Sequence, residues 1–307
     1  MNNLTKTVLL AVLLTFAHGQ PTFAQNFQNG LQAFKKGDYK TALREFRALS
    51  EQGDARAQYG LGRLYASGLG VIQDAEKAVR WYRKSAEQGN EFAQLYLGSA
   101  YSYGKGAGQD YKEAANWYGK SAKQGNPFAQ LYLGIAYSYG QGVEQSDKEA
   151  AVLYSQSAEQ GNAFAQVYLG SAYRLGRGVI QDHKKAVDWY RKSAEQGHDK
   201  AQFNLAVSYE EGNGVPKDYG QAANWYRKAA EQGALKAQLN LGSLYASGLG
   251  VVQDNIYAHM WFNIAGSHGD KIGIEKRDAV AKEMTASDIS KANELARDCV
   301  SKKYKGC

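Results

Sequence analysis

The chain has 307 residues, 44% of them hydrophobic, with a formal net charge of +7 and only 3 prolines. This composition excludes a disordered chain, because it holds enough apolar surface to bury a core. The charge is modest, and no run of lysine and arginine alternates with aromatic residues, which argues against binding of nucleic acid. The length is large for one closed globule but natural for a repeat array, in which each repeat contacts only its neighbours.

Residues 1–24 have the pattern of a secretory signal peptide. Lys6 supplies a positive charge, and residues 7–17 form an apolar run that is too short to span a bilayer comfortably. Small residues precede a cleavage site before Gln25, while cleavage after Gly19 and an uncleaved anchor are the alternatives. We therefore expect a periplasmic or secreted protein with no stable membrane span after signal cleavage.

Residues 25–56 are expected to form an N-terminal helix pair that is similar to tetratricopeptide repeats. The two helices are predicted over 26–37 and 38–52, with a connection shorter than those found later in the chain. An atypical first repeat is typical of the capping unit at the end of a repeat array.

From Ala57 a 36-residue pattern recurs six times, up to residue 272. Three columns show it: Ala57, Ala93, Ala129, Ala165, Ala201, Ala237; Leu61, Leu97, Leu133, Leu169, Leu205, Leu241; and Tyr65, Tyr101, Tyr137, Tyr173, Tyr209, Tyr245. A fixed period of this size predicts a stacked array of repeats. Within a repeat the three residues stand at i, i+4 and i+8, so they share one face of a helix.

Each repeat is predicted to contain a helix A, a glycine loop and a helix B. Glycines at the end of helix A and capping residues at the start of helix B set the boundaries. These residues are Gly68, Gly104, Gly140, Gly176, Gly212 and Gly248, and then Asp74, Asp110, Ser146, Asp182, Asp218 and Asp254. A glycine also stands inside helix A, as at Gly98, where it costs about 1 kcal/mol and predicts close approach between helix backbones.

Beyond residue 272 the period stops. Two further helices are predicted over 271–284 and 287–302, and residues 273–307 are expected to cap the last repeat. The two cysteines, Cys299 and Cys307, both lie in this segment. In an exported chain such a pair predicts a disulfide, with two free thiols as the alternative.

The repeated columns resemble Sel1-like repeats, a subfamily of the tetratricopeptide-repeat superfamily. In the first repeat the resemblance is carried by Ala57-Gln58, Leu61-Gly62, Tyr65, Gly68, Gly70-Val71, Asp74, Lys77-Ala78, Trp81-Tyr82 and Ala86-Glu87-Gln88-Gly89-Asn90. The resemblance implies an all-α, right-handed superhelical solenoid of antiparallel helix pairs and a role in protein–protein interaction. Some secreted members are linked to β-lactam binding or hydrolysis, but this chain lacks their repeat cysteines and the S-x-x-K motif of β-lactamases.

In such superhelices helix A lines the concave groove, so columns that differ between repeats are the candidates for ligand binding. The aromatic candidates are Phe92, Tyr96, Tyr103, Phe128, Tyr132, Tyr139, Phe164 and Tyr168. The polar candidates are two i, i+4 pairs that resemble a carboxylate clamp: Lys200 with Asn204, and Lys236 with Asn240. Packing between repeats is the alternative role for the aromatic residues, and solvation is the alternative for the lysines.

The sequence offers no convincing catalytic constellation. His183, His198, His259 and His268 have no metal-ligand spacing such as HExxH, and we expect each to lie at the surface. We therefore expect no cofactor and a non-catalytic, exported scaffold that binds a protein or peptide partner in its groove. The alternatives are an envelope enzyme or cell-wall ligand binder of the β-lactam or peptidoglycan type, and a secreted effector that engages host proteins.

Overall fold

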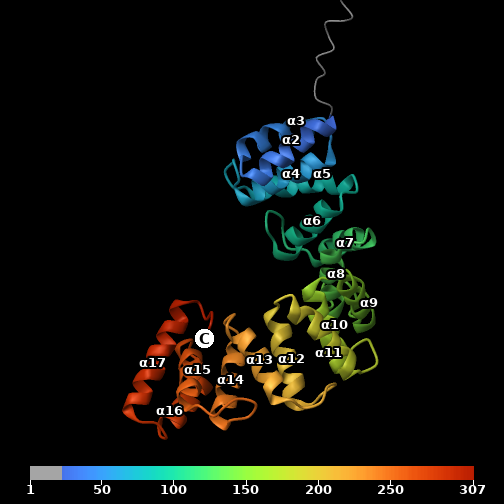
Figure 1. Cartoon of the computed structure of the whole chain (residues 1–307). Helices are drawn as coiled ribbons and strands as arrows, with labels where there is room; N and C mark the ends of the chain where they lie inside the picture. The colour runs from blue at the N-terminus through green and yellow to red at the C-terminus, as the bar shows by residue number, and fades with distance from the viewer. Residues whose placement is uncertain (1–22) are drawn as a thin grey trace, which may run out of the picture. The chain divides into compact units, whose positions relative to one another are not determined.

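The computed structural model describes residues 23–307, and this part of the chain is all-helical (Figure 1). The expected signal peptide falls almost wholly on residues 1–22 and lies outside the described residues. The helices are α2 Phe23–Lys36, α3 Tyr39–Glu51, α4 Ala55–Ser67, α5 Ala75–Glu87, α6 Glu91–Tyr103, α7 Tyr111–Lys123, α8 Pro127–Tyr139, α9 Asp147–Glu159, α10 Ala163–Leu175, α11 His183–Glu195, α12 Asp199–Glu211, α13 Tyr219–Ala230, α14 Leu235–Ser247, α15 Asn255–Ser267, α16 Lys271–Ala281 and α17 Ala286–Ser301. None of these helices is both long enough and apolar enough to cross a membrane.

The chain divides into two compact parts. The N-terminal part extends to Ala129 and includes Gln141–Val143, and the C-terminal part comprises Gln130–Gly140 and Glu144–Cys307. Within each part, consecutive helices pack as antiparallel pairs, such as α4 with α5 and α12 with α13. The predicted all-α solenoid of helix pairs is therefore confirmed, while the hand of the superhelix stays a prediction.

The core consists of clusters that neighbouring repeats share. One of them joins Tyr82 and Ala86 of α5 to Leu97 of α6 and Trp117 of α7. No single repeat encloses such a cluster by itself, because each helix pair is only two helices thick. Each repeat therefore has to pack against a neighbouring repeat in order to bury its apolar face and fold.

The glycine inside helix A makes room for an aromatic ring of helix B. A Cβ atom on Gly98 would lie 2.7 Å from the ring of Tyr118, which is closer than carbon atoms can approach. Gly62, Gly134, Gly170 and Gly242 stand in the same relation to Tyr82, Tyr154, Tyr190 and Phe262. The backbone of helix B is also close, as expected, since the same Cβ on Gly98 would lie 3.1 Å from the carbonyl oxygen of Ala114, but the nearest atoms belong to the buried ring.

Buried glutamine and serine side chains link each repeat to the next. Gln94 donates from Nε2 to the carbonyl oxygen of Ala86 at 3.1 Å, and its Oε1 accepts from Gln124 at 2.8 Å. Ser121 Oγ donates to the carbonyl oxygen of Glu91 at 2.8 Å. The glutamine pair recurs as Gln58 with Gln88, Gln130 with Gln160, Gln166 with Gln196, and Gln202 with Gln232. These bonds satisfy buried polar atoms, so they fix how one repeat is rotated against the next.

The glutamine series ends where the C-terminal helices begin. His268 stands where the pattern would place a glutamine, and Gln238 Oε1 has no hydrogen-bond partner among the described residues. His268 instead contacts the hydroxyl of Tyr304, 3.0 Å from its Nε2. A disulfide joins Cys299 to Cys307, with their Cα atoms 5.6 Å apart, and closes the loop that carries Tyr304. Cys299 and Tyr304 also pack on the apolar cluster of the last repeats.

Gly98→Ala tests the role of the helix A glycine. We expect a loss of about 1–3 kcal/mol in the free energy of unfolding, because the added methyl group displaces the Tyr118 ring. Gly119→Ala is the matched control: it lies within α7 with no atom within 4 Å of the added Cβ, and alanine there should gain about 0.5–1 kcal/mol. Urea unfolding followed by circular dichroism measures both, and equal stabilities for the two variants would contradict the assignment.

The double change Cys299→Ser and Cys307→Ser tests the C-terminal loop. Opening a loop of this length should destabilise α17 by about 2–3 kcal/mol in the chain-entropy model. Hydrogen exchange of the α17 amides should accelerate, while exchange in α10 stays unchanged. Dithiothreitol should reproduce the effect in the natural chain and have none on the variant. Unaltered α17 exchange in the variant would refute a stabilising role for the bond.

Candidate functional site: a groove across the A helices

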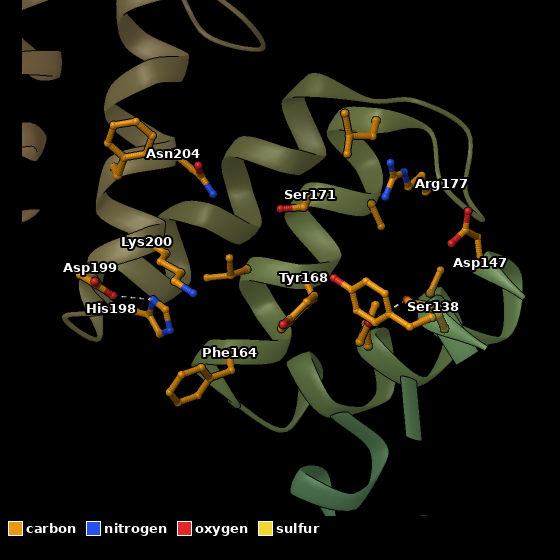
Figure 2. A pocket seen from close by; sticks show the side chains of 18 of the residues that line it. Ser138, Asp147, Phe164, Tyr168, Ser171, Arg177, His198, Asp199, Lys200 and Asn204 are labelled. Carbon is orange, nitrogen blue, oxygen red and sulfur yellow. Dashed lines mark hydrogen bonds and ion pairs between the residues drawn. The ribbon is translucent and has the colours of Figure 1, made fainter. Parts of the chain in front are cut away.

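A groove of about 720 Å³ crosses the A helices of the C-terminal part. The start of α12 faces the middle of α10 across it, and the start of α9 closes its far side (Figure 2). Its lining residues are Ser138, Tyr139, Asp147, Ala150, Ala151, Tyr154, Phe164, Val167, Tyr168, Ser171, Ala172, Leu175, Arg177, His198, Asp199, Lys200, Phe203, Asn204, Ala234, Leu235 and Lys236. A groove of this size accommodates a short peptide segment or a ligand of drug-like size.

Helix α10 supplies the floor of the groove along its whole length. Phe164, Tyr168, Ser171 and Leu175 stand at i, i+4, i+7 and i+11, so they form one stripe of the helix. At 1.5 Å per residue this stripe is about 16 Å long, enough for about five residues of extended chain. The floor is apolar at its two ends and has a hydroxyl in the middle.

Two tyrosines form the wall beside α9. The rings of Tyr154 and Tyr168 stack with centroids 5.1 Å apart and an interplanar angle of 22°. Tyr154 shares a hydrogen bond of 2.8 Å with Ser138 Oγ. Burial raises the pKa of Tyr154 well above its ordinary value, so its hydroxyl stays protonated. The wall is therefore rigid and uncharged, and it suits an apolar side chain of a ligand.

His198 closes the groove at the start of α12. Its ring meets Phe164 edge to face with centroids 4.6 Å apart, and only 9% of its side chain is exposed. Its Nδ1 has no hydrogen-bond partner in the described part of the chain and lies 3.5 Å from the Asp199 carboxylate. Burial is the main cause that lowers the pKa of His198. The charge of Lys200 lowers this pKa further, and the carboxylate of Asp199 raises it in part. The imidazole is thus neutral near pH 7.

Two of the four histidines in residues 23–307 do not lie at the surface as expected. His198 is a wall of the groove, and His259 of α15 is 3% exposed. Burial and the nearby Arg277 lower the pKa of His259. The column of His259 carried a signal for its burial, because the other members are Val79, Ala115, Ala151, Val187 and Ala223, which are all buried.

Six of the predicted binding residues line the groove. They are Tyr139, Phe164, Tyr168, Lys200, Asn204 and Lys236. Tyr132 and Asn240 belong to the same part of the chain but do not line it. Asn240 donates from Nδ2 to the hydroxyl of Tyr226 at 2.8 Å, and that hydroxyl donates to the carboxylate of Glu210. The two proposed lysine–asparagine pairs are therefore not equivalent, since one asparagine faces the groove and the other packs inside.

The remaining four predicted residues lie in the N-terminal part. Phe92 and Tyr96 each contact Tyr59, with ring centroids 5.9 and 5.8 Å apart, and Tyr96 stacks on Tyr82 at 5.5 Å. Burial raises the pKa of Tyr59 to about 12. These contacts give Phe92 and Tyr96 a role in packing between repeats. Tyr103 and Phe128 are more than half exposed, as expected for residues that face outward.

Sequence reasoning missed several residues that line the groove. These are Val167, Leu175, Arg177, His198, Asp199 and Phe203, among others. His198 carried a detectable signal, because its column reads Asp54, Asn90, Asn126, Asn162, His198, Ala234 and Asp270. Only His198 and Ala234 break the run of capping residues there. Over the described residues, no group of three histidine, cysteine, aspartate or glutamate side chains is placed to hold a metal ion.

The exposed floor and the buried wall should respond differently to truncation. Phe164 is 56% exposed, so Phe164→Ala should change the free energy of unfolding by less than about 1 kcal/mol. Tyr154 is 4% exposed, and Tyr154→Ala should cost about 3–5 kcal/mol. Urea unfolding compares the two. A large loss of unfolding free energy in Phe164→Ala would mean that this ring belongs to the core. The residue would then be unsuitable as a probe of binding.

Comparison with known proteins identifies the family. The Sel1 repeat model matches residues 55–90, 92–126, 127–162, 163–198, 199–233 and 235–270, more than half of the chain. The chain is similar to a Sel1 repeat protein from Oxalobacter formigenes, with 35% identity, a TM-score of 0.72, and coverage of 78% of this chain and 96% of that one.

It is also similar to a protective antigen present in uropathogenic Escherichia coli strains, with 34% identity and a TM-score of 0.60. That similarity covers 93% of this chain and 70% of the antigen. No curated protein matches the chain. Six matched repeats and the helix-pair architecture lead to one conclusion: the chain belongs to the Sel1 repeat family.

Proposed function

We propose that the chain is an exported, non-catalytic scaffold that binds an extended peptide segment of a protein partner in the groove across α8, α10, α12 and α14. The observation that carries this proposal is the composition of the groove. An aromatic wall and an apolar floor on α10 face Lys200, Asn204 and Lys236 on the opposite side. Such a mixture binds an apolar side chain by burial and fixes the backbone by hydrogen bonds.

Three further observations support the proposal. Helices of a solenoid hold a groove rigid without a ligand, so little entropy is lost on binding. The disulfide between Cys299 and Cys307 suits an oxidising compartment, in agreement with the signal pattern of residues 1–24. A relative of the chain is described as a protective antigen, which fits a place outside the cytoplasm.

We further propose a division of labour along the chain. Residues 25–56 and 273–307 would cap the two ends of the array, and residues 57–272 would present the binding surface. The predicted aromatic binding residues would then differ in role between the two parts of the chain. Phe92 and Tyr96 contribute chiefly to packing, and Tyr139, Phe164 and Tyr168 contact the partner.

Capture of the partner tests the proposal. The mature chain, immobilised through a C-terminal tag, is incubated with envelope extract of its source cells, and bound proteins are identified by mass spectrometry. We expect a protein that the natural chain retains and the double variant Phe164→Ala, Lys200→Ala loses by about tenfold or more.

Val252→Ala serves as the matched control, because Val252 is 87% exposed and does not line the groove. Retention of the same proteins by the natural chain, the control and the double variant would contradict binding in the groove. Hydrolysis of nitrocefin by the purified chain, abolished by one substitution, would contradict the non-catalytic assignment.

A further inference from the structure

The last repeat meets the C-terminal cap, helices α16 and α17, through a polar stripe of α15. Helix α15 packs against both cap helices (Figure 1). Asn263 donates from Nδ2 to Oδ1 of Asn293 in α17 at 3.0 Å, and Arg277 of α16 donates to Asn263 Oδ1 at 3.4 Å. Asn255 donates from Nδ2 to the carboxylate of Glu283, just after α16, at 3.5 Å. Side-chain hydrogen bonds thus attach the cap to α15 at both ends of this stripe.

His259 lies in the middle of the same stripe. It stands four residues after Asn255 and four before Asn263, so the three side chains share one face of α15. His259 is 3% exposed, and its Nδ1 has no hydrogen-bond partner among the described residues. The five preceding repeats have valine or alanine in this column, all of them buried. Among the six repeats, a titratable residue therefore replaces the apolar one only where the array meets its cap.

The surroundings of His259 accept a neutral imidazole but not a charged one. A neutral imidazole donates a hydrogen bond from one ring nitrogen, whereas an imidazolium donates from both. The Nδ1–H of an imidazolium would have no acceptor at this place, since Nδ1 has no partner there. A buried charge without a partner is costly, so protonation of His259 opposes the packing of α15 against the cap.

The charged neighbours of His259 strengthen this effect. Burial is the main cause that lowers the pKa of His259, and the charge of Arg277 in α16 lowers it further. Asp278 raises it in part, but its carboxylate is already paired with Arg277 at 2.7 Å and its side chain is 59% exposed. Helices α14 and α17 also pack against α15, and their described residues add no charged group that shifts this pKa.

We propose that His259 is an acid-sensitive contact whose protonation detaches α16 and α17 from α15 and opens the C-terminal end of the array. Local opening gives water access to the charges of His259 and Arg277, while the other repeats stay stacked because each contacts only its neighbours. Opening also uncovers Phe262 and Ala265 of α15, which lie in the apolar cluster that Val280 of α16 contacts. Acid therefore exposes an apolar end surface, and this property does not depend on the groove or its partner.

The direction of the pH dependence follows from proton linkage. A free histidine has a pKa of about 6.5, and the pKa of His259 is lower in the closed form, so the open form binds the proton more readily. The stability of the closed cap is fully present above about pH 6.5 and is lost as the pH falls below it. At pH 5.0 the open population can rise by at most about 30-fold, which is the ratio of protonated to neutral free histidine at that pH.

Hydrogen exchange of the mature chain at pH 7.5 and pH 5.0, corrected for intrinsic exchange rates, tests the proposal. We expect the opening equilibrium of the α16 and α17 amides to rise by about 5- to 30-fold at pH 5.0, while that of α10 stays unchanged. His259→Val and His259→Ala should abolish the rise. Both variants are expected to fold, because valine and alanine occupy this column in the other repeats.

His268→Gln is the matched control, because His268 is the other histidine at the cap and contacts the Tyr304 hydroxyl at 3.0 Å. The five preceding repeats have glutamine in its column, and this variant should keep the acid response. An opening equilibrium that does not change at pH 5.0 in the natural chain would overturn the proposal. So would a rise that persists in both His259 variants, which would assign it to carboxylates, or a rise that His268→Gln abolishes.

Discussion

The packing of a helix B aromatic ring against a helix A glycine is the contact on which the rest of this structure depends. Five of the six repeats contribute one glycine and one ring, as in Gly98 with Tyr118, and the ring fills the space where a side chain would otherwise stand. The fifth repeat has Ala206 in the glycine column. The pair sets the distance between the two helices of a repeat. The glutamine and serine hydrogen bonds then set the rotation of one repeat against the next.

The groove arises from residues that these contacts leave free. Ala165 and Leu169 of α10 are fully buried in the core, whereas Phe164 and Tyr168 lie on the adjacent stripe of the same helix that lines the groove. The repeat geometry places this stripe opposite the start of α12, so residues more than 30 positions apart face one another. The scaffold thus determines where a ligand can lie, and a few non-repeated side chains determine its chemistry.

Helix capping connects stability to that chemistry. A capping asparagine or aspartate stabilises a helix end and at the same time covers the amides that an anion would use. The chain has the cap at α10 and lacks it at α12 and α14, whose first residues line the groove. Loss of two caps reduces the stability of both helices.

The sequence by itself determined the family, the all-α repeat architecture, and the boundaries of its helices to within a few residues, because the same signals recur in register six times. It also pointed to the columns from which Tyr139, Phe164, Tyr168 and Lys200 reach the groove. Only the tertiary structure separated Asn204, which lines the groove, from Asn240, which is bonded to Tyr226. Only the tertiary structure, too, placed His198 in the wall of the groove. The physical reason is that periodicity reports which face of a helix is buried, whereas the partner of a single non-repeated side chain depends on neighbours that are distant in sequence.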